Sequence, residues 1–113
     1  MNVEDIREFC LSLPLVTEDL KWGNNLCFLV GEKIFCLTDL DSDFAASLKV
    51  EENDFEEVTA RDGIIQATHF AKRKWILVTE PDALRDDEWT RLLIRSYELV
   101  RANLKKKVQA QLL

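Results

Sequence analysis

Two apolar, β-prone runs separated by only two residues place the strongest constraint on how this chain can fold. Residues 26–30 and 33–40 flank Gly31 and Glu32. A two-residue connection that begins with glycine is typical of a β-hairpin with a type II′ turn. The sequence therefore predicts a hairpin in the first half of the chain.

Helical periodicity opens the chain. Residues 2–13 place Val3, Ile6 and Cys10 on one side of a helical wheel, with charged side chains elsewhere. Asn2 is a suitable N-cap, and Pro14 is a natural stop. We expect an amphipathic helix here, followed by an ordered connection over residues 15–25.

Further elements follow the hairpin. Residues 45–50 resemble a third strand, residues 51–60 suit a short acidic helix, and residues 75–79 suit a strand. Residues 64–70 are either a strand or an irregular extended segment. A long helix is predicted from Asp86, the expected cap, to about Leu104, with Ser96 as a small residue on its apolar face. A polar tail begins near Lys105.

Length and composition indicate one domain. A chain of 113 residues with 47% hydrophobic composition buries roughly two-thirds of its unfolded surface. No apolar run approaches the roughly 20 residues that cross a bilayer, and the N-terminus lacks the positive flank of a signal peptide, so a cytoplasmic protein is expected. Cys10, Cys27 and Cys36 are odd in number and lie in apolar patterns, which predicts buried, reduced thiols and no zinc site.

The charge is unevenly distributed along the sequence. The net charge is −6, yet residues 1–60 carry 4 basic and 14 acidic side chains (−10), whereas residues 61–113 carry 11 and 7 (+4). Such polarity can orient a molecule toward a polyanion. The acidic total argues against strong nonspecific DNA binding.

The basic half contains a short run with the best candidate contact residues. His69, Lys72, Arg73, Lys74 and Trp75 fall within seven positions. The three cations form either a solvated turn or a contact surface for phosphates or an acidic protein. Trp75 begins an apolar strand, so packing in the core is favoured over stacking on a base. His69 has no nearby serine or cysteine arrangement, and we expect no catalytic role for it.

Other charged residues can be part of a contact surface or simply face solvent. Lys33 and Lys49 can each add to a cationic patch on the uncovered side of a sheet. The lysines at 105–107 either add phosphate contacts or complement the dipole of the last helix. Arg91, Arg95 and Glu98 share one side of the last helix, as either a basic surface or a solvated face. The acids of the short helix offer a weak cation site at best; they are Glu51, Glu52, Asp54, Glu56 and Glu57.

Metal and enzyme motifs are not evident in the sequence. Asp39, Asp41 and Asp43 alternate, but the loop lacks the glycine and terminal glutamate of an EF-hand. There is also no phosphate-binding glycine loop, nucleophile elbow or metal-ligand spacing. We therefore predict neither a resident metal, nor a cofactor, nor an enzymatic activity.

The order of motifs resembles the MmcQ/YjbR family of small bacterial proteins. The matching features are CLSLP at the end of the first helix, VGEKIF in the hairpin, SLKV, the basic run before Trp75, and SYELV before a lysine-rich end. The resemblance covers nearly the whole chain, residues 1–113. It implies a single α+β domain of CyaY-like, frataxin-resembling architecture, with helices packed on one face of an antiparallel sheet. It also implies DNA binding, by analogy with a double-wing arrangement.

Three functional hypotheses follow. The first is a DNA-binding or regulatory module that contacts phosphates through Lys72, Arg73, Lys74, Lys49 and His69. The second is an interaction module for an acidic protein partner. The third is a frataxin-like metal binder that uses the acids of the short helix.

Overall fold

The fold comprises three helices and six strands in the part of the chain that the computed structural model describes, residues 1–68, 70 and 73–104. The helices are α1 (Val3–Ser12), α2 (Glu52–Thr59) and α3 (Asp86–Ala102). The strands are β1 (Thr17–Lys21), β2 (Asn25–Val30), β3 (Lys33–Asp39), β4 (Ala46–Lys49), β5 (Ile64–Gln66) and β6 (Trp75–Val78). The predicted polar tail from Lys105 lies outside the described residues.

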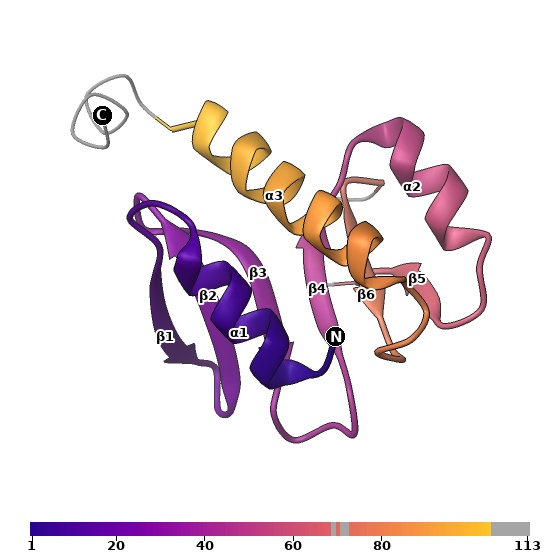
Figure 1. Ribbon diagram of the computed structural model, residues 1–113, viewed down its shortest axis with the longest axis horizontal. Coiled ribbons are helices and arrows are strands. Elements are labelled where there is room, and N and C mark those ends of the chain that lie inside the picture. The colour runs from indigo at the N-terminus through magenta and orange to yellow at the C-terminus, as the bar shows by residue number, and fades with distance from the viewer. Residues whose placement is uncertain (69, 71–72, 105–113) are drawn as a thin grey trace.

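All six strands join one antiparallel sheet in the order β1-β2-β3-β4-β6-β5. Figure 1 shows α1 and α3 lying across the same face of this sheet, with α2 beside β5 and β6. The predicted α+β class, with helices on one face of an antiparallel sheet, is confirmed. No helix in the described ranges is both long enough and apolar enough to span a membrane.

The first helix begins and ends where its sequence predicts. The Asn2 side chain accepts a hydrogen bond from the backbone N–H of Asp5 at 2.8 Å, and the Asp5 carboxylate accepts from the Asn2 N–H at 3.1 Å. This reciprocal capping satisfies two backbone donors that the first turn cannot pair internally. Leu13, which precedes Pro14, is extended with ψ 147°, and the helix stops there.

The predicted hairpin is confirmed as β2 and β3, but the predicted turn type is wrong. Gly31 has φ 56° and Glu32 has φ 67°. A type II′ turn needs a positive φ only at its first central residue, whereas a type I′ turn needs it at both. The turn is therefore of the I′ kind, whose twist matches that of the flanking strands even with a glutamate in the left-handed region.

One strand was not predicted. The segment expected to be an ordered connection, residues 15–25, contains β1, which pairs with β2 along the edge of the sheet. All but the last of its five residues are exposed, so it lacks the alternation that marks a half-buried strand. β1 forms because the backbone groups of β2 offer it a partner, which is a tertiary cause.

The remaining predicted elements are present with small changes at their ends. β4, α2 and β6 lie within the predicted ranges, and the uncertain segment 64–70 contains the short strand β5. The long helix begins at Asp86 itself, and the N-cap position is Arg85. The Glu88 side chain accepts a hydrogen bond from the Arg85 N–H at 3.1 Å, so a carboxylate in the first turn caps this end of α3.

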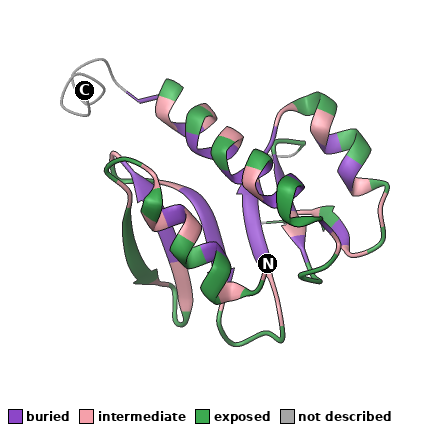
Figure 2. Cartoon of the chain, in the orientation of Figure 1, coloured by how far each residue is buried: buried purple, intermediate pink, exposed green. Residues whose placement is uncertain are grey.

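The main core lies between the sheet and the helices, as the buried segments in Figure 2 indicate. The largest buried side chains include Trp89 from α3 and Phe28 and Phe35 from the hairpin. The hairpin contains a β-bulge: Phe28 pairs with Cys36 and Leu29 pairs with Ile34, which leaves Phe35 as the extra residue. The bulge lets both Phe35 and Cys36 enter the main core.

Ser96 joins α3 to two strands at the point where they separate. Its hydroxyl donates to the Phe35 carbonyl at 2.5 Å and accepts from the Lys49 N–H at 2.9 Å. Ser96 is fully buried, and its small side chain lets the helix approach the strands closely. A side chain thus replaces the backbone pairing that β3 and β4 do not make at this end of their ladder.

We expect Ser96→Ala to lower the free energy of unfolding by about 2–3 kcal/mol, because it leaves a buried N–H and a buried carbonyl without a partner. Urea unfolding at pH 7 measures the change. Ser12→Ala, at the exposed end of α1, is the control and is expected to change stability by less than about 0.5 kcal/mol. Equal effects of the two substitutions would contradict a special role for Ser96.

Glu88 is a buried carboxylate held by an arginine from the loop after α2. Arg61 donates to its two oxygens at 2.9 and 2.7 Å, and the Glu88 side chain is only 8% exposed. These bonds, together with the Arg85 N–H, lower the pKa of Glu88 from 4.5 to about 2. The ionised form is therefore favoured in the folded state.

The lowered pKa of Glu88 predicts a pH-dependent contribution to stability. This contribution is fully present above about pH 4.5 and is lost as the pH falls toward 2, because the unfolded chain takes up the proton first. We expect Glu88→Gln to lower the free energy of unfolding by about 2 kcal/mol at pH 7 and by much less at pH 3. Urea unfolding across this range tests it. The neighbouring Asp87→Asn, at a side chain 74% exposed, should show a small difference throughout.

Candidate nucleic-acid interface

The sheet has a second face that no helix covers within the described residues. Because alternate strand residues point to opposite sides, Ile76 and Val78 enter the main core while Trp75 and Leu77 point away from it. Leu77 pairs with Ser47, and β2 and β3 add Cys27, Leu29 and Leu37 to the same side. We call this side the open face.

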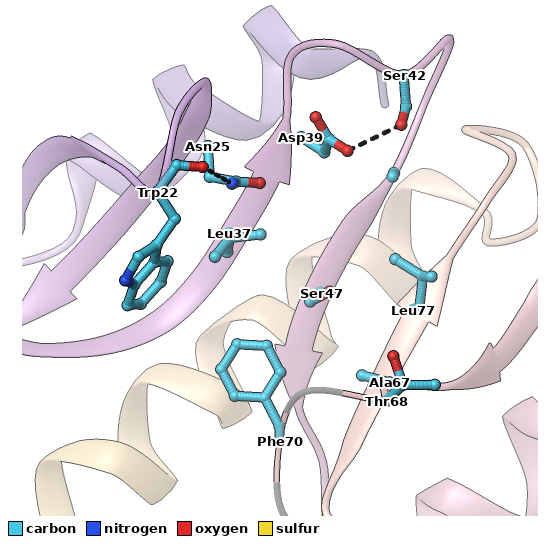
Figure 3. A pocket seen from close by; sticks show the side chains of 11 residues that line it. Trp22, Asn25, Leu37, Asp39, Ser42, Ser47, Ala67, Thr68, Phe70 and Leu77 are labelled. Atoms are coloured by element: carbon cyan, nitrogen blue, oxygen red, sulfur yellow. Dashed lines mark hydrogen bonds between the residues drawn. The ribbon is translucent and has the colours of Figure 1, made fainter.

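A groove of about 640 Å³ runs over the open face. Figure 3 shows its lining side chains, which come from the β1–β2 turn, the β3–β4 loop, the strands β2, β3, β4 and β6, and the segment before β6. Trp22, Leu37, Phe70 and Leu77 supply the apolar surface. This volume lies within the range of roughly 300–1,000 Å³ that is typical of small-molecule sites.

Two aromatic side chains line the groove, one from the β1–β2 turn and one from the segment before β6. Trp22 follows β1 and is 71% exposed, an unusual position for a tryptophan. Its backbone has φ 49° and the next residue, Gly23, has φ 87°, so the chain reverses tightly here. Phe70 stacks on Trp75 with ring centroids 4.1 Å apart and an angle of 16° between the planes. The groove is therefore flanked by aromatic surface.

Polar groups gather at the end of the groove nearest β2 and β3. The Asn25 amide donates to the Trp22 carbonyl at 2.9 Å, which fixes the orientation of the amide. The Asp39 carboxylate accepts from the Asp41 N–H and from the Ser42 hydroxyl, both at 2.9 Å. This end of the groove is rich in hydrogen-bond acceptors.

Two lysines lie beyond the other end. Lys49 pairs with Trp75 in the sheet, so its side chain is on the open face, two residues along β4 from Ser47 in the groove. Lys74 lies beside Val50, the residue after Lys49, because the Lys74 carbonyl accepts a hydrogen bond from the Val50 N–H at 2.8 Å. Partial burial and the nearby Lys74 charge lower the pKa of Lys49. The two cations are therefore close together.

Among the described residues, the structure does not bring the predicted cations Lys49, Arg73 and Lys74 into one cluster. Arg73, with φ 62°, turns toward α2, where it pairs with Glu56 at 2.5 Å and Glu52 at 3.5 Å and lies over the Phe55 ring. Lys49 lies on the open face, and Lys74 is close enough for its charge to lower the pKa of Lys49. Lys72 and His69 lie outside the described residues. The neighbouring cations Arg73 and Lys74 thus lie in two different environments.

Trp75 is packed, as the sequence predicts, but on the open face. It is 8% exposed, as expected of a packed residue, yet it lies on the open face and not in the main core. Phe70 covers it and offers the accessible ring. The sequence reasoning did not identify Trp22, Asn25 or Phe70. The sequence signal that could have identified Trp22 is its position directly before Gly23, which marks an aromatic residue in a turn.

The acids of the α2 region are paired with arginines. Asp54 meets Arg91 at 3.4 Å, Glu57 meets Arg61 at 3.4 Å, and Glu51 pairs with Arg95. Within the described ranges, no group of three or more histidine, cysteine or acidic residues is arranged to hold a metal ion. Arginine partners compete with any cation for these carboxylates, which disfavours the metal-binding hypothesis.

All three cysteines are free and buried, which confirms the predicted burial. Burial raises the pKa of Cys27, on the open face, to about 11. A hydrogen bond with Cys10, together with burial, raises the pKa of Cys36 well above its ordinary value. Because the thiolate is the reactive form, these groups should be inert in the folded protein.

We expect the native protein at pH 8 to react with Ellman's reagent far more slowly than the unfolded protein. A pKa of about 11 leaves roughly one Cys27 thiol in a thousand ionised at that pH. Absorbance at 412 nm with and without denaturant measures the rates. A thiol that reacts fully within seconds in the native protein would contradict the burial described here.

The chain belongs to the YjbR family, whose model matches residues 11–99. Its fold is similar to that of the Deinococcus radiodurans protein DR2400, which carries the domain DUF419: the TM-score is 0.88, with 29% identity over 98% of this chain and 87% of that one. A Pseudomonas syringae protein is similar with a TM-score of 0.71 and 21% identity, over 88% and 98%. No curated protein matches the chain in sequence.

Proposed function

We propose that this protein binds single-stranded nucleic acid on the open face of its sheet. The observation that supports this most directly is the combination of a groove flanked by Trp22 and Phe70 with Lys49 and Lys74 beyond one end. Bases stack on aromatic rings, and lysines neutralise phosphates. An uncovered sheet with aromatic side chains is a recurring platform for unpaired bases.

The concave shape of the site favours a single strand over a duplex. In a duplex the bases are stacked on one another, so their faces are not available to Trp22 and Phe70. An unpaired base can enter the groove while its phosphate remains outside, near the lysines. The local positive charge of Lys49 and Lys74 matters more here than the net charge of −6, because screening limits repulsion to about 10 Å at ordinary salt.

A protein partner with an acidic surface is the competing explanation for the two lysines. Such a partner would gain from the cations but would have no specific use for a groove flanked by aromatic rings. The contribution of Trp22 to binding therefore separates the two possibilities.

We expect a labelled single-stranded 12-mer to bind with an affinity that falls steeply with salt, and more tightly than the matching duplex. Lys49→Ala and Lys74→Ala should each reduce the slope of log K against log salt by about 0.7, the value for one phosphate contact. Trp22→Ala should weaken binding at least about fivefold through lost stacking. Fluorescence anisotropy across a salt series measures all three.

The matched control is Lys33→Ala. Lys33 is exposed and pairs with Val30, whose side chain lies in the main core, so this lysine does not belong to the open face. Its replacement changes the net charge by the same amount and should leave the slope unchanged. Absent binding, salt-insensitive binding, or tighter binding to the duplex would each overturn the proposal.

A further inference from the structure

The polar end of the groove has a hydrogen-bonding pattern that selects among bases. Asn25 uses one amide hydrogen on the Trp22 carbonyl, so its Oδ1 acceptor and its second amide hydrogen remain for a ligand. In Figure 3 the amide oxygen of Asn25 points toward β3. The side chain thus presents an acceptor and a donor next to each other, held in one orientation.

Asp39 strengthens the acceptor character of this end. Its carboxylate accepts from the Asp41 N–H and the Ser42 hydroxyl and keeps further lone pairs, since two carboxylate oxygens offer about four acceptor positions. A ligand group placed between Asn25 and Asp39 must therefore donate. A carbonyl oxygen in the same position would face acceptors on both sides and lose its water without replacement.

On this basis, and resting on the proposed function, we propose that the groove takes one unstacked base of the strand and prefers adenine to thymine or uracil. Adenine presents an amino donor beside a ring-nitrogen acceptor, the pattern that complements an asparagine amide. Thymine and uracil offer only a single N3–H donor between two carbonyl oxygens, so a base whose N3–H meets Asn25 places a carbonyl oxygen against the Asp39 carboxylate, whereas the adenine amino group has a hydrogen for each. The aromatic side chains Trp22 and Phe70 provide stacking surface for the faces of the base.

The position of the lysines agrees with this orientation of the base. Ser47 lies in the groove, and Lys49 lies two residues further along β4 on the same face, a separation of about 6.6 Å. A nucleotide whose amino group is held at Asn25 and Asp39 therefore extends its sugar and phosphate toward Lys49. The groove has an acceptor-rich end for the base and a cationic end for the phosphate.

The test leaves the protein unchanged and varies the base. The probes are a dT 12-mer, the same strand with one central adenine, and the same strand with purine in that place, which lacks the 6-amino group. We expect the adenine strand to bind about tenfold more tightly than the dT strand, and the purine strand to lose most of this gain. Competition anisotropy at fixed salt measures the three affinities.

A pair of neighbouring asparagines provides the protein control. Asn25→Ala should bring the ratio of adenine to thymine affinity close to one. Asn24→Ala should keep the ratio, because the Asn24 side chain donates to Asp41 and is not among the groove residues. Equal affinity of wild type for the adenine and dT strands, or a preference that survives Asn25→Ala, would overturn the adenine inference alone.

A failure of the proposed function would give a different result in the same assay from a failure of the adenine preference. If none of the strands binds, single-stranded nucleic acid is not the ligand and both proposals fall. An arm with AMP separates two sources of the same base: AMP that binds to the free protein as tightly as the strand does, and with the same dependence on Asn25, would support adenine recognition but assign it to a free nucleotide.

Discussion

The hydrogen bonds of Ser96 are the interaction on which the arrangement of this fold depends. The long helix α3 crosses the sheet where β3 bulges, and the Ser96 hydroxyl pairs with the Phe35 carbonyl of β3 and the Lys49 N–H of β4. A larger side chain would hold the helix away, and an apolar one would leave both backbone groups unpaired. With α3 fixed at this point, Tyr97 packs edge-on against Phe35 and donates to the Pro14 carbonyl, which ties the end of α1 to the same helix.

This attachment places the described helices on one side of the sheet and so leaves the other side without helical cover. Parallel sheets are covered on both faces, whereas an antiparallel sheet can leave one face to solvent. Here that face is apolar in part: Cys27, Leu29 and Leu37 form a second small cluster, to which Ile34 and Phe70 add cover. An apolar face with partial cover is unusual for a surface that has only to be solvated.

Local structure was largely predictable, and long-range pairing was not. The hairpin and the helices follow from periodicity and capping residues such as Asn2, which act within a few positions of the chain. β1 was missed because its stability comes from β2 and not from its own pattern. The site was only partly predictable for the same reason. The sequence identified Lys49 and Lys74 by charge and Trp75 by type, whereas Trp22, Asn25 and Phe70 meet only through the sheet.

The charge asymmetry of the sequence illustrates how folding changes the meaning of a pattern. The acidic first half and the basic second half suggest a polar molecule, yet many of these charges meet each other: Arg91, Arg95, Arg61 and Arg73 pair with acids of the α2 region. Arginine favours such pairing because its planar group matches a carboxylate. Lys49 instead lies on the open face with Lys74 close to it, and their mutual repulsion favours an anionic ligand. The net charge of the chain therefore does not describe the local charge beside the groove. The arginines are largely paired with the acids of α2, whereas the two lysines supply the positive charge near the groove.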